Sequence, residues 1–133
     1  MISGAKILIV DDDASHRFML ESVLGSWGYS TEEADDGRTA VGMVRGCRYA
    51  LVLMDIRMKM LSGLDALLEI KHIARCIPVI LMTAYCNQKV VANALLNGAV
   101  AVLNKPLHLD ELKTVLKRVM AQNCIEEWKI PPD

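Results

Sequence analysis

Carboxylate, hydroxyl and ammonium side chains follow the apolar runs of this 133-residue chain. The residues are Asp11, Asp12 and Asp13 after the first run, Asp55 after the third, Thr83 after the fourth and Lys105 after the fifth. Carboxylates gathered in one crevice repel one another unless a cation joins them. An all-oxygen ligand set with open positions suits Mg²⁺, which keeps bound water and accepts phosphate oxygens. These residue types therefore predict a divalent-ion site, provided that the fold brings the ends of the runs together.

Each of these residues also has an ordinary structural interpretation. Asp13 directly precedes the first helical pattern, so we predict that it caps that helix. A carboxylate such as Asp55 at the end of an apolar run is costly unless it is used. Thr83 is at home in a strand, and Lys105 before Pro106 is compatible with a surface position. Only the combination of these residues indicates a functional site.

Short apolar runs alternate with helical patterns about five times along the chain. The predicted strands are Lys6–Val10, Tyr29–Ala34, Tyr49–Met54, Pro78–Met82 and Ala99–Leu103. The first, third and fourth are almost continuously apolar, which is typical of a parallel sheet covered by helices on both faces. We predict an open, doubly wound α/β sheet, because a closed eight-stranded barrel needs about twice the residues. Ligands of such sheets bind outside the carboxyl ends of the strands, where these polar residues are placed.

Helical patterns separate the predicted strands and follow the last one. An apolar stripe from residue 20 leads up to Gly28, which we expect in a left-handed conformation at the helix end. Helices are also expected near 64–71, over 88–96 and, with the clearest stripe, over 109–120. The pattern over 38–45 is weaker because Gly42 costs about 1 kcal/mol relative to Ala.

Composition excludes several classes of protein. Hydrophobic residues make up 53% of the chain, which excludes a disordered protein, and the net charge of −1 lacks the basic excess needed to bind nucleic acid directly. No apolar run approaches the roughly 18 residues of a membrane helix and no secretion signal is recognised, so we expect a cytoplasmic protein with no membrane partner. The cysteines at 47, 76, 86 and 124 lack metal-ligand spacing and are expected to be thiols.

At the predicted strand ends, the chain resembles the receiver domains of two-component response regulators. The matching segments are Ile7–Asp12, Leu53–Met58 with Gly63, Met82–Ala84 and Lys105–Pro106. The resemblance covers residues 4–122, so we expect a receiver domain over 1–123 and a tail, or the start of a linker to an effector domain, over 124–133. Within the family, the segment Asp11–Arg17 is most similar to receivers of nitrogen-regulation-type enhancer-binding transcription activators.

The resemblance implies a fold and a set of site residues. The fold would be flavodoxin-like, with strand order 2-1-3-4-5 and five helices. Asp55 would accept a phosphoryl group, and Mg²⁺ would be held by Asp11, Asp12, Asp55 and the backbone carbonyl of Arg57. The residues that would contact the phosphate are Thr83, Ala84 and Lys105.

The resemblance also implies partners. A sensor histidine kinase would donate the phosphoryl group, and the phosphorylated surface would control an output such as transcription. The domain would be a phosphoacceptor that takes part in its own phosphorylation and dephosphorylation, without multiple turnover. We expect a homodimer through the fourth helix, fifth strand and fifth helix, and an ATPase and DNA-binding effector in the full-length protein.

The sequence departs from the family pattern at four positions. Lys59 replaces a usual Pro and Ser62 a common acid, so the loop after Asp55 is expected to be more mobile than usual. Val102 replaces the aromatic ring whose rotation accompanies Thr movement in many relatives, which argues against ring-coupled switching. His108 replaces an Asp at a helix start, which predicts a weaker cap.

Two hypotheses concern the surroundings of the phosphate. Arg57 and Tyr85, each two residues beyond a site residue, are expected to flank the phosphate and hinder the hydrolytic water. The Lys105–Pro106 bond is expected to be cis, as is usual in the family.

Other functions remain open at this point. A degenerate receiver would act as a phosphorylation-independent interaction module with the same fold. An aspartyl-phosphate phosphatase of the haloacid dehalogenase type would need a general acid two residues after Asp55, where this chain has Arg57. A flavin-binding module would need a small or hydroxyl-rich phosphate loop after the first strand, where the three acids at 11–13 repel phosphate.

Overall fold

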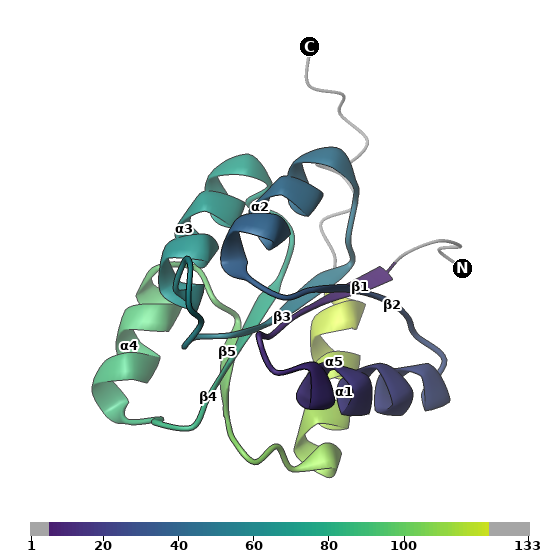
Figure 1. Ribbon diagram of the computed structural model, residues 1–133. Coiled ribbons are helices and arrows are strands. Elements are labelled where there is room, and N and C mark those ends of the chain that lie inside the picture. Colours follow the sequence, from purple (N-terminus) through teal and green to yellow (C-terminus); the bar gives the residue numbers. More distant parts are fainter. Residues whose placement is uncertain (1–5, 123–133) are drawn as a thin grey trace.

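Five parallel strands form one sheet in the order β2-β1-β3-β4-β5 in a computed structural model that describes residues 6–122 (Figure 1). The strands are β1 (Lys6–Val10), β2 (Ser30–Ala34), β3 (Leu51–Asp55), β4 (Val79–Thr83) and β5 (Ala101–Asn104). The helices are α1 (Ala14–Ser26), α2 (Gly37–Gly46), α3 (Gly63–Ile73), α4 (Gln88–Leu96) and α5 (Leu109–Ala121). The predicted doubly wound α/β sheet, its strand order and its five helices are confirmed.

Helices cover both faces of the sheet (Figure 1). Buried residues of α2, α3 and α4 form one hydrophobic cluster with alternate residues of the strands, and buried residues of α1 and α5 form a second cluster with the others. Successive strand residues point to opposite faces. All five residues of β3 and of β4 are therefore buried, which explains their continuous apolar character.

The bounds of β1 are as predicted, and those of the other four strands differ from the prediction by one or two residues at one or both ends. Asp55 and Thr83 are the last residues of β3 and β4, whereas we had placed each of them just after its strand. The backbone ladder is the reason: Asp55 pairs with Met82, and Thr83 pairs with Asn104. Backbone hydrogen bonds form whether or not the side chain is polar, so β3 and β4 each extend one residue beyond the end of their apolar runs.

The predicted helix ends are largely confirmed. The Asp13 side chain caps α1 by accepting hydrogen bonds from the amides of Ser15 and His16. Gly28 follows α1 with a φ of 95°, the left-handed conformation that favours glycine. His108 precedes α5 and makes no side-chain capping bond, in agreement with the weaker cap expected there.

A polar network ties β1 and β2 together at the end of the sheet where β1 begins. The Lys6 ammonium and the Tyr49 hydroxyl both donate to the Glu32 carboxylate, each at 2.6 Å. Tyr49 is 1% exposed, so its hydroxyl needs this acceptor. The network secures the sheet at the opposite end from the predicted site.

The cysteines correct one expectation. Cys47 and Cys86 are free thiols, as predicted, whereas Cys76 is disulfide-bonded. Distances along the chain do not reveal which cysteines approach one another in space, so the sequence could not predict this. Cys124 lies outside the described residues. Within residues 6–122, no helix is long and apolar enough to cross a membrane.

Candidate functional site

The ends of β1, β3 and β5 bring three charged side chains together. Asp11 directly follows β1, Asp55 ends β3 and Lys105 directly follows β5. The Lys105 Nζ atom lies 2.7 Å from Asp55 Oδ2 and 3.2 Å from Asp11 Oδ2. Neighbouring parallel strands end at the same edge of the sheet, which is why residues far apart in sequence meet here.

Asp11 is fully buried and fully engaged in hydrogen bonds. Its Oδ1 accepts from the Asp13 amide at 2.9 Å, and its Oδ2 accepts from His16 Nδ1 at 2.6 Å as well as from Lys105. Burial acts to raise the pKa of Asp11, but the hydrogen bonds from His16 and Asp13 and the charge of Lys105 outweigh it and lower the pKa below its usual value. Asp11 is therefore a carboxylate at neutral pH.

Lys105 is the internal counter-ion of the two acids. Burial acts to lower its pKa, but the hydrogen bond to Asp55 and the charges of Asp11 and Asp55 raise the pKa above its usual value. Its ammonium is therefore charged at neutral pH. The backbone amide of Lys105 also donates to the Thr83 carbonyl at 2.8 Å, which holds the end of β5 against the end of β4. The Lys105–Pro106 peptide bond is cis, as expected.

Asp12 completes a group of three carboxylates. One carboxylate oxygen from each of Asp11, Asp12 and Asp55 can be chosen so that all three lie within 4.8 Å of one another. Asp11 and Asp55 are buried, whereas Asp12 is exposed, so the group opens to solvent on one side. Hard oxygen donors with access to water fit the coordination preferences of Mg²⁺.

The loop after β3 wraps closely around the end of the strand. The Arg57 amide donates to Asp55 Oδ1 at 3.1 Å, and the Gly63 amide donates to the Ile56 carbonyl at 2.7 Å. A Cβ atom at Gly63 would lie 2.3 Å from the Asp55 carbonyl oxygen, closer than any non-bonded contact allows. This position therefore requires glycine. Lys59, within the loop, is exposed.

Thr83, Ala84 and Tyr85 form the rim after β4. Thr83 is buried, and its Oγ1 accepts a hydrogen bond from the Tyr85 amide at 3.0 Å. Ala84 is exposed. The Arg57 guanidinium stacks over the Tyr85 ring, with Cζ 4.7 Å from the ring centre, so the loops after β3 and β4 meet at this pair.

The response regulator receiver domain family matches residues 7–117. The chain belongs to this family. The receiver is 43% identical over 115 residues to the transcriptional regulatory protein ZraR of Escherichia coli K12, covering 86% of this chain and 26% of ZraR. It is 35% identical over 115 residues to sporulation initiation phosphotransferase F of Bacillus subtilis, covering 86% of this chain and 93% of that protein.

Solved structures agree with this assignment. The receiver domain of the sensor histidine kinase PA1611 of Pseudomonas aeruginosa, solved with a magnesium ion in its active-site cleft, matches with a TM-score of 0.82 and 34% identity over 90% of this chain and 100% of that one. The NtrX receiver domain of Brucella abortus matches with a TM-score of 0.83 and 29% identity over 89% and 100%. This chain is a receiver of a two-component response regulator, and it spans about a quarter of the length of the ZraR proteins it matches.

Two contacts of this receiver site were not predicted from the sequence. His16 holds the Asp11 carboxylate, and Arg17 donates to the Asp11 carbonyl at 2.6 Å. Both residues were noted only as part of a family-like segment. Their reach back to the end of β1 depends on how tightly the chain turns into α1, which residue spacing alone does not reveal.

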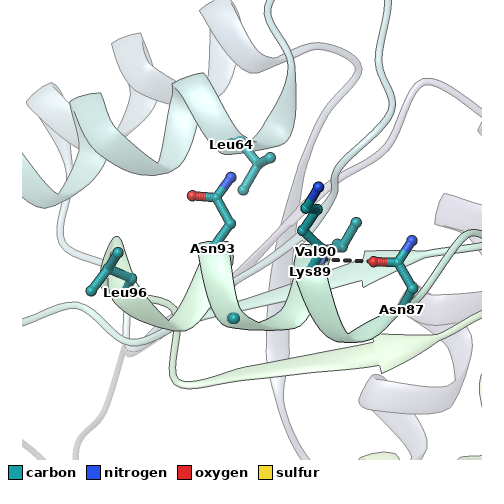
Figure 2. A pocket seen from close by; sticks show the side chains of 7 residues that line it. Leu64, Asn87, Lys89, Val90, Asn93 and Leu96 are labelled. Carbon is teal, nitrogen blue, oxygen red and sulfur yellow. Dashed lines mark hydrogen bonds between the residues drawn. The ribbon is translucent and has the colours of Figure 1, made fainter.

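A hollow of about 520 Å³ lies beside α4 in the receiver, apart from the carboxylates. Figure 2 shows α4 residues facing Leu64 of α3 across it. Its lining residues are Leu64, Asn87, Lys89, Val90, Ala92, Asn93 and Leu96. Leu96 is 85% exposed, so α4 presents apolar surface at its carboxyl end. Val102 lies in β5 and packs against the core cluster on the α4 side.

Proposed function

We propose that Asp55 is the phosphoacceptor of this receiver. The observation that carries the proposal is the 2.7 Å contact between the Lys105 ammonium and Asp55, beside two further carboxylates. An Asp55 carboxylate oxygen bonds to phosphorus as the bond from phosphorus to a histidine nitrogen of the sensor kinase breaks. The electron pair of the broken bond stays on the imidazole nitrogen, which is the leaving group.

The metal ligands in this proposal are Asp11, Asp12, Asp55 and the Arg57 backbone carbonyl. The oxygen chemistry of the three carboxylates supports Mg²⁺ as the cofactor. When bound, Mg²⁺ offsets negative charge on the transferring phosphoryl group. The three carboxylates would bind the ion. Their exposed side, at Asp12, leaves room for the phosphoryl donor to approach.

Thr83, Ala84 and Lys105 contact the phosphoryl group after transfer. The Lys105 ammonium supplies positive charge, and the Thr83 hydroxyl, whose oxygen accepts from the Tyr85 amide, has its proton available to donate to a phosphoryl oxygen. The phosphoryl group adds about −1.5 to −2 charge. This charge favours a second arrangement of the loops after β4 and β5, so the result of phosphorylation is a changed surface and no released product.

The changed surface acts on partners in this proposal. The face formed by α4, β5 and α5 carries exposed Leu95, Leu96 and Leu109 beside charged residues, which supports a homodimer through this face. Relatives that are transcriptional regulators are more than three times as long as this chain. We therefore propose that the receiver occupies residues 1–123, that residues 124–133 begin a linker, and that an ATPase and DNA-binding effector follows in the full-length protein. The output of this cytoplasmic protein would be the control of transcription.

Exposure to a small phosphodonor tests the phosphoacceptor. The purified protein is incubated with acetyl phosphate and Mg²⁺, and its intact mass is measured. We expect a gain of one phosphoryl group that requires Mg²⁺, disappears in Asp55→Asn and persists in the control Asp110→Asn, which alters an exposed acid of α5. No mass gain in the wild type would refute the proposal and favour the phosphorylation-independent module. Continuous turnover of a phosphoester would favour a phosphatase.

A further inference from the structure

His16 lies in the first turn of α1 and reaches back to the end of β1. Its Nδ1 atom is 2.6 Å from Asp11 Oδ2, the shortest contact that the Asp11 carboxylate makes. The His16 side chain is 18% exposed and that of Asp11 is fully buried, so the bond lies at the inner wall of the site. Nothing in the proposed phosphoryl transfer uses this imidazole.

The chemistry of the pair fixes the direction of the bond. An ionised carboxylate can only accept hydrogen bonds, so His16 Nδ1 must donate. Both a neutral imidazole with its proton on Nδ1 and an imidazolium can donate this bond. The bond therefore requires a proton on Nδ1 and does not require a charge on His16.

Within residues 6–122, Asp11 Oδ2 accepts from one donor besides His16, and that contact is longer. The second donor, Lys105, is farther away at 3.2 Å and is shared with Asp55 at 2.7 Å. A cation that arrives at the acids competes with the Lys105 ammonium for the carboxylate oxygens, and a phosphoryl group on Asp55 competes with Asp11 for the ammonium. Among the hydrogen bonds of residues 6–122, the His16 imidazole bonds only to Asp11, so it keeps the carboxylate oriented when Lys105 turns away.

We propose that His16 is a positioning residue that sets the affinity of the acidic group for divalent cations by holding the Asp11 carboxylate in its binding orientation. The inference rests on the proposed metal site and adds to it a residue that touches neither metal nor phosphate. Hydrogen bonds to metal-binding carboxylates typically change metal affinity by about 10- to 100-fold when they are removed. We expect the lower end of this range, because the Asp13 amide still orients Asp11 Oδ1.

Divalent-cation binding without any phosphodonor tests the proposal. Mg²⁺ is titrated calorimetrically, and Mn²⁺ binding is followed by loss of the electron paramagnetic resonance signal of the free ion. The variants are His16→Leu, which removes the donor, and His16→Asn, whose amide nitrogen can replace Nδ1. His72→Leu is the matched control, since His72 is exposed in the last turn of α3 and, within residues 6–122, forms no hydrogen bond or ion pair with the three acids. Thermal unfolding in EDTA verifies that each variant is folded.

The expected result is a rise in Kd of about tenfold for both ions in His16→Leu, substantial recovery in His16→Asn and no change in His72→Leu. Combining His16→Leu with Asp11→Ala should add almost nothing to the loss that Asp11→Ala causes, because His16 acts through Asp11. An unchanged or lower Kd in His16→Leu, with normal binding by the wild type, would overturn this proposal and leave the phosphoacceptor intact. Absence of cation binding by the wild type would overturn both.

Discussion

Replacing Gly63 with Ala tests how tightly the loop after β3 is packed against the phosphoacceptor. The added Cβ would lie 2.3 Å from the Asp55 carbonyl oxygen and 2.7 Å from Ile56 Cα. Carbon atoms in ordinary contact are about 3.5–4.0 Å apart, so at least one backbone segment must move. Gly63 is not among the glycines with positive φ, so the expected effect is entirely steric.

The expected loss of stability follows from the atoms involved. Overpacking a core costs about 1–3 kcal/mol, and the upper end applies when backbone, which cannot rotate away, is the obstacle. For a domain of this size, a loss of about 3 kcal/mol lowers Tm by roughly 10 °C. The moving atom belongs to Asp55 itself, and misplacing reacting groups by about 1 Å can slow a reaction roughly a hundredfold. Phosphorylation should therefore slow by about tenfold or more.

Urea unfolding and the rate of phosphorylation by acetyl phosphate measure the two effects. Gly42→Ala is the matched control, since a Cβ there meets nothing within 4 Å and Gly42 lies inside α2. That variant should gain about 0.5–1 kcal/mol and keep the wild-type rate of phosphorylation. A Gly63→Ala protein that matches the wild type in both stability and rate would refute the packing argument.

Further predictions concern a helix cap, the lifetime of the phosphorylated state and alkaline stability. Asp13→Ala removes the acceptor for two amides of the first turn of α1, so the unfolding free energy should fall by about 1 kcal/mol in urea titrations; an unchanged value would contradict the cap. Arg57→Ala and Tyr85→Ala each break the stacked pair beside the acceptor, so the phosphorylated protein should hydrolyse faster in both, and wild-type lifetimes in both would count against shielding. Burial, helped by Glu32, raises the pKa of Tyr49, so the stability that its protonated form provides is complete below about pH 10 and is lost as the pH rises further. Above about pH 10, the unfolding free energy should therefore decline more steeply in the wild type than in Tyr49→Phe, whereas parallel profiles would show that Tyr49 does not titrate in this way.

The fold could be predicted because its main determinants are local in sequence. Continuous apolar runs identify strands buried on both faces, and the polar residues after them identify the edge where ligands bind. The ends of β3 and β4 were misplaced because Asp55 and Thr83 take part in backbone pairing despite their polar side chains. Residue type predicts burial better than it predicts the extent of a hydrogen-bonded ladder.

The candidate site could be predicted only in part. Asp11, Asp55 and Lys105 were found because each lies at or next to a strand end, and strand ends are shared by the whole sheet. His16, by contrast, lies in a helix and not at a strand end. Its contact with Asp11 depends on the turn between β1 and α1 and on one side-chain conformation. The disulfide at Cys76 was not predicted for a similar reason, since disulfide formation depends on proximity in space and not on spacing along the chain.

Lys105 joins its neighbours through two chemically independent bonds. The backbone amide secures the Thr83 carbonyl, while the ammonium at the far end of the side chain secures Asp55. Any amino acid other than proline can supply the first bond, but only a long cation can supply the second. Exchanging Lys105 for an uncharged residue of similar length would thus remove the ion pair with Asp55 and keep the backbone pairing of β4 with β5. A single substitution therefore separates the structural role of this position from its chemical role.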